Sequence, residues 1–331
     1  MSNKTDPDRE HPRLRSRPSL NFGRRCWLWL LNDKRAFGEM DEESRARFDW
    51  LRVVPFVAIH LACLAVIQVG ASAVAIGVAV ALYALRMFFV TAFFHRYFAH
   101  RAYRTSRLVQ CVMAVLGCTA GQRGPMWWAA HHREHHITSD TERDPHSPAH
   151  RGFLFSHTLW FLTRGSFATP AHRARDWLRY PELVWVEKLD WLPFIALAGA
   201  CWGLGAWLES AAPSLATSGP QMLVWGFFIS TVMLYHATYT INSLAHRFGT
   251  RRYDTRDDSR NNAWLALITL GEGWHNNHHR FPAAARQGFF WWEIDLSFLG
   301  LRLMSMFGLV HDLRPVPAHV LADSQRVASP Q

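Results

Sequence analysis

Between residues 53 and 94 the chain is almost free of charge, and only His60, Gln68 and Arg86 interrupt the apolar residues. A helix that spans a bilayer needs about 20 apolar residues, so this run predicts two spans, at 53–68 and 72–94. The stretch "QVGAS" is the expected tight turn between them. No other feature of the sequence limits the possible folds so strongly.

Two later apolar runs predict spans at 191–208 and 221–241, which makes four in all. The N-terminus, the segment 95–190 and everything after residue 241 then lie on one side of the membrane. The two loops left for the other side contain no Lys or Arg, whereas the long segments are rich in both. By the positive-inside rule the long segments and both termini are expected in the cytoplasm. A soluble protein with buried helical hairpins is the alternative. The charge pattern argues against it, because Lys and Arg are missing only from the loops that four spans would place on the opposite side of the membrane.

The segments outside the spans differ in character. Residues 1–25 are dominated by Arg, Pro, Asp and Ser, which predicts a disordered basic N-terminus. Residues 26–31 are too short to span a bilayer but suit its interface, and residues 108–121 are expected to form a buried or partly inserted helix. Residues 316–331 form a tail too short to fold alone. The net charge of +10 is compatible with nucleic acid, an anionic membrane surface or an anionic substrate, so it does not select a partner.

Histidines occur in four clusters, at 95–100, 131–136, 242–246 and 275–279, and all four lie on the predicted cytoplasmic side. Spacings of three and four residues place two or three imidazoles on one helical face. Imidazole is a good ligand for iron, copper, nickel or zinc, whereas a structural zinc site needs four ligands and often uses thiolate. About nine imidazoles suggest two ions. The five cysteines form no CxxC pair and are expected to be reduced core residues. A pH sensor and ordinary core histidines remain the alternatives.

The strings "HRYFAH", "HHREHH", "NSLAH" and "GEGWHNNHHRFP" resemble the histidine boxes of the membrane fatty acid desaturases. The similarity is closest to the acyl-CoA desaturases of stearoyl-CoA type in their bacterial form, and it runs from about Val53 to Pro315. It implies one desaturase domain over 26–315, in which four membrane helices carry a cytosolic helical cap made from 95–190 and 242–315. It also implies a diiron site in this cap and a location in the bacterial inner membrane.

The resemblance also implies roles for particular residues. The nine histidine ligands would be His95, His100, His132, His135, His136, His246, His275, His278 and His279. Asn242 would reach one metal through water, and Gln122, Trp128, Thr238 and Tyr239 would line the bend of an acyl tunnel. Tyr239 stands where animal relatives have Trp. His131 is expected beside the ligands, and Asp140, Asp144, Glu272 and Asp295 are candidates for hydrogen bonds to ligand imidazoles. For Asp140 a solvated surface position is the favoured alternative.

The implied activity is an O₂-dependent desaturation that introduces a cis double bond into a long-chain acyl group. The expected substrate is an acyl-CoA, desaturated at the Δ9 position, with acyl-lipid and acyl-carrier substrates as the main alternatives. No nucleic acid partner is expected. Electrons would come from a separate ferredoxin, cytochrome or reductase. A diiron hydroxylase of lipids or carotenoids is a rival within the enzymes. A membrane metal or haem carrier is a rival of another class, and it predicts ligands inside the spans, where only His60 and His236 lie.

Overall fold

The computed structural model describes residues 21–327, and nearly all regular structure in this range is helical. The disorder predicted for residues 1–25 falls mostly on residues 1–20, which lie outside the described range. Residues 22–25, by contrast, are helical and begin α1 (Phe22–Leu30), which is capped by the side chain of Asn21. At the other end, residues of the expected tail form α16 (Ala318–Val327), and Val320 is buried beside Tyr253 and Phe289. The tail therefore packs as part of the fold at least as far as Ser324, which is buried.

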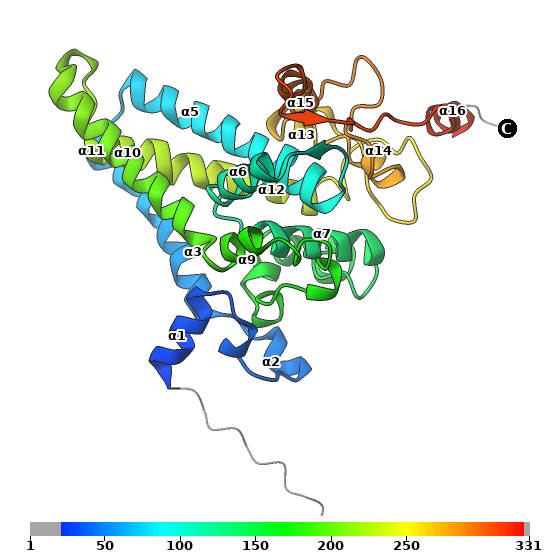
Figure 1. The fold of residues 1–331 in the computed structure, drawn as a ribbon, viewed down its shortest axis with the longest axis horizontal. Coiled ribbons are helices and arrows are strands. Elements are labelled where there is room, and N and C mark those ends of the chain that lie inside the picture. Colours follow the sequence, from blue (N-terminus) through cyan, green and yellow to red (C-terminus); the bar gives the residue numbers. More distant parts are fainter. Residues whose placement is uncertain (1–20, 328–331) are drawn as a thin grey trace, which may run out of the picture.

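The four predicted spans are confirmed as long apolar helices, each a few residues longer than expected. The first is Trp50–Val69, which contains α3 (Trp50–Ala62) and α4 (Val66–Val69). The second is Ala73–Ala99, in which α5 (Ala73–Phe88) continues as a π-helix over Phe89–Ala99. The third is α10 (Trp191–Ala211), and the fourth is Gly219–Ser243, with α11 (Gly219–Met222), a π-helix over Leu223–Ile229 and α12 (Ser230–Ser243). Figure 1 shows α3, α5, α10 and α11 extending to the left of the molecule.

The turn between the first two spans lies where the sequence predicts it. Gly70 has a positive φ of 65°, a conformation that glycine adopts without strain, and it ends α4. The hydroxyl of Ser72 then accepts a hydrogen bond from the N–H of Ala75 and caps α5. The helix of the second span does not stop at residue 94. It continues through His95 and Arg96, because its last turns are buried on all sides by other parts of the chain.

The remaining helices form a body at one end of the spans. They are α2 (Glu42–Ala46), α6 (Arg107–Cys118), α7 (Pro125–Thr138), α8 (Pro148–Arg151), α9 (Pro181–Lys188), α13 (Ala263–Ile268), α14 (His275–Arg280) and α15 (Leu296–Met306). A short antiparallel pair joins β1 (Arg104–Thr105) to β2 (Val310–His311). The largest buried core lies around Phe94, Phe98, Met113 and Trp177. The segment 108–121, expected to form a buried or partly inserted helix, contains most of α6, in which Met113 faces the core while Leu108 and Val112 are exposed.

A buried carboxylate fixes the start of α7, the helix that carries the second histidine cluster. Glu187 accepts hydrogen bonds from the N–H of Met126, at 2.9 Å, and from the hydroxyl of Thr169, at 2.7 Å. The first N–H groups of a helix have no partner within the helix, so this carboxylate satisfies one of them. Burial, together with the nearby Asp190, raises the pKa of Glu187 from its ordinary 4.5 to about 7. Gly124, which precedes α7, has no room for a Cβ because Glu187 lies against it.

A buried arginine joins the second and fourth spans. Arg86 of α5 donates hydrogen bonds to the hydroxyls of Ser230, at 2.5 Å, and Thr231, at 2.8 Å. Its other bonds go to the carbonyl oxygens of Leu82 and Thr119, so every partner found for it is neutral. A charged side chain inside a membrane span is costly and is tolerated where it faces the bundle interior and is hydrogen-bonded. Arg86 therefore ties together the two helices that lead to His95 and to Asn242.

Candidate metal centre

The nine histidines come together as two adjacent groups. His95, His100, His132, His136 and His278 form the first group, and His135, His246, His275 and His279 form the second. In each group the facing ring nitrogens lie within 4.8 Å of one another. These side chains come from the end of the second span, from α7, from the segment after α12 and from α14. The structure thus brings together four stretches that are far apart in the sequence.

Two helices supply imidazoles to both groups. On α7, His132 and His136 point into the first group and His135 into the second. On α14 the division is reversed, because His275 and His279 belong to the second group and His278 to the first. Residues four apart lie on nearly the same side of a helix, and the residue between them in this pattern is rotated away by about 100°. The spacing H-x-x-H-H therefore lets one helix serve two neighbouring sites.

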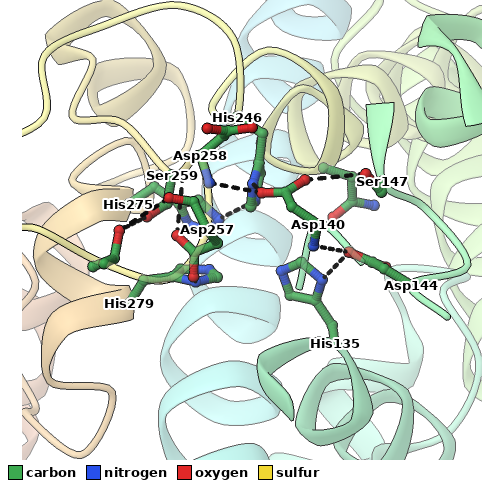
Figure 2. Close-up of polar contacts among 12 residues, drawn as sticks. His135, Asp140, Asp144, Ser147, His246, Asp257, Asp258, Ser259, His275 and His279 are labelled. Carbon is green, nitrogen blue, oxygen red and sulfur yellow. Dashed lines mark hydrogen bonds and ion pairs between the residues drawn. The ribbon is translucent and has the colours of Figure 1, made fainter. Parts of the chain in front are cut away.

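Buried carboxylates orient four of these imidazoles from outside. The Nδ1 of His135 lies 3.1 Å from Asp144, that of His246 lies 2.7 Å from Asp140, and that of His279 lies 2.7 Å from Asp257 (Figure 2). In the first group, the Nδ1 of His95 contacts Glu272, which is also held by Arg96 at 3.0 Å. A carboxylate accepts the Nδ1–H of an imidazole and leaves the Nε2 lone pair free on the opposite side of the ring. These lone pairs are therefore directed into the two groups.

The inward nitrogens satisfy the requirements of a metal site better than those of a hydrogen-bonded core. In the second group, His135, His246 and His279 all use Nδ1 as the donor to a carboxylate, so three Nε2 acceptors converge and only the Nε2 of His275, 3.0 Å from that of His246, can donate to them. The buried Nε2 of His279 has no hydrogen-bond partner. Lone pairs that face one another without a donor repel, and a cation between them removes this repulsion. Ordinary core histidines would be hydrogen-bonded instead.

The spacing of the nitrogens also bears on the kind of ion. Five Nε2 pairs lie 2.9–3.0 Å apart: His95–His278, His100–His132, His132–His136, His136–His278 and His246–His275. Two nitrogens that are each about 2.1 Å from an ion and subtend about 90° lie about 3.0 Å apart, whereas a tetrahedral angle gives about 3.4 Å. The spacing fits an ion with octahedral-type angles. Such geometry with open positions is typical of non-haem iron and differs from structural zinc.

Most of these imidazoles are neutral near pH 7. Burial, with the neighbouring imidazoles, holds the pKa of His132, His136 and His275 well below the ordinary range. Burial also lowers the pKa of His279 to about 4, although Asp257 opposes the shift. His135 differs: burial lowers its pKa, but the charge and hydrogen bond of Asp144, together with the charges of Asp140 and Asp257, outweigh burial and raise the pKa. Neutral imidazole is the form that binds metals, and rings that stay neutral across the physiological range do not sense pH there.

The carboxylates and His131 show where sequence reasoning succeeded and failed. Asp144 and Glu272 contact imidazoles as expected, but the surface position favoured for Asp140 is wrong, because its side chain is buried against His246. Asp295 contacts Arg96, not a ligand candidate. His131 does not join either group; it lies half-buried beside Trp127, and its buried Nε2 has no hydrogen-bond partner.

Three residues near the imidazoles were not singled out in the sequence. Asp257 holds His279, Gln287 donates a hydrogen bond to Glu272 at 3.0 Å, and the ring of His146 lies 4.4 Å from that of His135. Only the adjacent "DPH" string offered a signal for His146. Asp257 cannot be told from Asp254 or Asp258 by its sequence context, because all three lie in the same polar loop.

An apolar cavity of about 280 Å³ reaches His132 of the first group. Its walls include the four residues expected at the bend of the acyl tunnel, Gln122, Trp128, Thr238 and Tyr239, together with Asn242. The amide of Gln122 donates a hydrogen bond to the hydroxyl of Thr238 at 3.1 Å. A smaller cavity of about 40 Å³ shares Trp128, His132, Thr238 and Asn242 with the first and is also lined by His95, His135 and His275. The apolar cavity therefore ends at His132, next to a smaller cavity that is lined by imidazoles of both groups.

The membrane histidines do not form a metal group. His60 and His236 contact each other through Nε2 atoms at 3.1 Å, and the Nδ1 of His236 contacts His157. The Nδ1 of His60 lies 2.7 Å from the carbonyl oxygen of Phe56, which completes a chain of hydrogen bonds. None of the metal-capable groups found among residues 21–327 includes either ring. This arrangement gives no support to a carrier with ligands inside the spans.

Comparison with known proteins agrees with the geometry. Residues 71–296 match the model of the fatty acid desaturase family. The chain is 34% identical over 278 residues to an sn-1 stearoyl-lipid 9-desaturase of Anabaena variabilis, which covers 82% of this chain and 96% of that protein. It is 34% identical over 292 residues to the protein of the same name from Synechocystis, covering 86% of each. An acyl-CoA 5-desaturase of Anemone leveillei is 33% identical over 276 residues, covering 82% of this chain and 81% of that protein. From its matched sequence and its histidine-lined cavity, this integral membrane protein belongs to the fatty acid desaturase family.

Proposed function

We propose that the protein uses O₂ and two irons to introduce a cis double bond into a long-chain acyl group near the Δ9 position. The observation that carries this proposal is the shared wall of the two cavities. Trp128, Thr238 and Asn242 line both the apolar cavity and the smaller cavity between the imidazole groups. A methylene chain held in the apolar cavity would thus lie against the metal-binding side chains.

Each histidine group would hold one iron. Two irons, when bound, supply the oxidising power that breaking an unactivated C–H bond requires and that no side chain provides. The protein's own part is to orient the imidazoles that would bind the irons. Asp140, Asp144, Asp257 and Glu272 keep four Nδ1–H groups engaged, so that the Nε2 lone pairs stay directed inward. Asn242 borders the same space and is the candidate for a contact through water.

The acyl chain would be positioned by the cavity wall. The hydrogen bond from Gln122 to Thr238 fixes two polar side chains at the expected bend, and the rings of Trp128 and Tyr239 add flat apolar walls. Holding one carbon pair beside the irons removes much of the entropic part of the barrier. His131 lies on the wall of the same cavity, so its role would be to shape the cavity rather than to support a ligand.

The acyl carrier is CoA or a membrane lipid. The resemblance of the sequence to acyl-CoA desaturases supports the first, and the names of the two cyanobacterial relatives support the second. Electrons would come from a separate carrier, a ferredoxin, a cytochrome or a reductase. The absence of Lys and Arg from the loops at 68–72 and 209–220 supports an inner-membrane orientation with the histidines in the cytoplasm.

The test is expression in a host that makes no unsaturated fatty acids, followed by mass spectrometry of its total fatty acids. The proposal predicts products two hydrogens lighter than the saturated chains, whereas products heavier by one oxygen would show a hydroxylase and overturn it. His278→Ala should abolish the product, because His278 contacts both His95 and His136. The matched control is His172→Ala, which removes a ring that is 57% exposed and should leave the product unchanged. Purified protein supplied with stearoyl-CoA or with stearoyl-lipid vesicles then identifies the carrier.

A further inference from the structure

Helices α13 and α15 present an apolar surface that no other part of the described chain covers. On α15, Leu299, Leu303 and Met306 are exposed at spacings of four and three residues, so they share one face. On α13, Trp264 is 78% exposed and Leu267 is also exposed. We call these five residues the α13–α15 ridge. Large exposed apolar patches mark a surface that contacts a membrane or a partner.

The depth of the ridge follows from its contacts with the second span. A helix crosses the hydrocarbon core in about 20 residues, which from Ala73 extends to the neighbourhood of Ala92. Tyr83 lies well inside this range, and its hydroxyl donates a 2.5 Å hydrogen bond to the carbonyl oxygen of Ile268 at the end of α13. Phe88 lies there as well and packs so closely on Gly300 of α15 that a Cβ would not fit. Both helices therefore lie beside a membrane-spanning part of α5, as Figure 1 shows for the right-hand end of that helix.

The charges near the ridge point to the same environment. The segment 263–309 contains three carboxylates, Glu272, Glu293 and Asp295, and all three are buried. Arg302, which adjoins Leu303, is exposed. A segment that exposes apolar groups and cations but no anion suits a lipid surface, where apolar side chains enter the acyl region and Arg extends to the headgroups.

We infer that the α13–α15 ridge is embedded in the acyl chains of the bilayer leaflet on the histidine side. The surface is continuous with that of the second span, so the lipid that surrounds the span also covers the ridge. A series of contacts connects α15 to the metal-binding groups. Asp295 caps α15 and contacts Arg96 at 2.9 Å, and Arg96 holds Glu272 beside His95. Lipid packed on α15 thus supports the position of a first-group imidazole. This inference does not depend on the reaction that the protein catalyses.

The test measures how fast a charged, membrane-impermeant maleimide reacts with single cysteines in the full-length protein. The five native cysteines, none of which forms a disulfide, are replaced by alanine, and Leu303→Cys is compared with Arg302→Cys in membrane sheets open on both sides. The pair is matched because the two residues are adjacent on α15 and both are exposed. We expect Leu303→Cys to react about tenfold or more slowly, since hydrocarbon disfavours the reactive thiolate. After unfolding in detergent and urea the two rates should be equal.

Two results would overturn the inference. Equal reaction rates in membranes would place residue 303 in water. Protection of Leu303→Cys that is lost when the protein is diluted with excess lipid, to below one copy per membrane sheet, would show that a second copy covers the ridge. Protection that survives this dilution supports lipid as the occupant. No arm of the experiment measures desaturation, so its outcome is separate from that of the proposed function.

Discussion

Replacing Asp257 by Asn tests whether a carboxylate outside the metal-binding groups controls the affinity of the second group. Asp257 Oδ2 lies 2.7 Å from His279 Nδ1, and the side chain is only 10% exposed. Burial alone would raise the pKa of Asp257, but the hydrogen bond and charge of His279 and the hydrogen bonds with Ser259 together outweigh burial and hold the pKa below its ordinary value. The group is therefore an anion at pH 7. The amide keeps the shape and removes the charge.

The expected magnitude follows from this contact. Removing a carboxylate that orients a ligand imidazole lowers metal affinity about 10- to 100-fold, which corresponds to about 1.4–2.8 kcal/mol. We expect the loss to fall on the second group, because His279 belongs to that group alone. The purified variant should therefore retain about one iron for every two in the parent protein after dialysis against a weak chelator.

The matched control is Asp258→Asn. Asp258 is the next residue in the same loop, but its side chain is 53% exposed and its nearest cation, on Arg251, is 3.8 Å away. Iron content is measured by elemental analysis, and product formation is measured in membranes with excess electron donor. Equal iron loss in the two variants would refute the reasoning, because the loop and not the carboxylate contact would then be responsible. Full iron retention in Asp257→Asn would refute it as well.

Three further predictions follow from buried polar contacts. Glu187→Gln should raise the thermal unfolding midpoint at pH 8. Because the pKa of Glu187 is raised in the folded parent protein, the folded state binds a proton between about pH 4.5 and 7 that the unfolded chain does not bind. The stability of the parent therefore falls by on the order of 3 kcal/mol as pH rises through that window. Melting curves at pH 5 and pH 8 should therefore differ less in the variant than in the parent. Thr238→Val should leave the amide of Gln122 without its partner, at a cost of about 1–3 kcal/mol, and gas chromatography of the products should show a second positional isomer. Arg86→Ala should destabilise by about 2–5 kcal/mol, because the bridge to Thr231 is lost and a cavity is left; Arg86→Met fills that space and should show the smaller drop in midpoint.

The membrane helices could be predicted from the sequence because their signal is local. The apolar run at 53–94 is long enough for two crossings, and the turn at Gly70 and Ser72 lies where the composition changes. Their ends were less predictable. The second helix passes residue 94 and carries His95, since its continuation depends on burial by distant segments that hydropathy does not register.

The candidate ligands could also be selected from the sequence, but their pairing could not. Helical spacing predicts that His132 and His136 share a face, and they do. It does not say that His135 on the same helix serves another group with His246 and His275. That division depends on which helix faces each side of α7, and such contacts join residues more than a hundred positions apart in the chain.

The carboxylates show the same limit. Asp140 and Asp257 lie in polar loops that read as solvent-exposed, and only the folded chain places them against His246 and His279. Burial then changes their chemistry, because a carboxylate in a dry site acts as a strong and directional acceptor.

The sequence by itself determined that this chain crosses a membrane four times and offers nine imidazoles outside the bilayer centre, because hydropathy and residue identity are properties of short segments. The tertiary structure decided which imidazoles lie in the same group, which acids orient them and where α15 lies relative to the second span. Those features depend on distances between segments remote in the chain, and such distances are fixed only when the helices pack together.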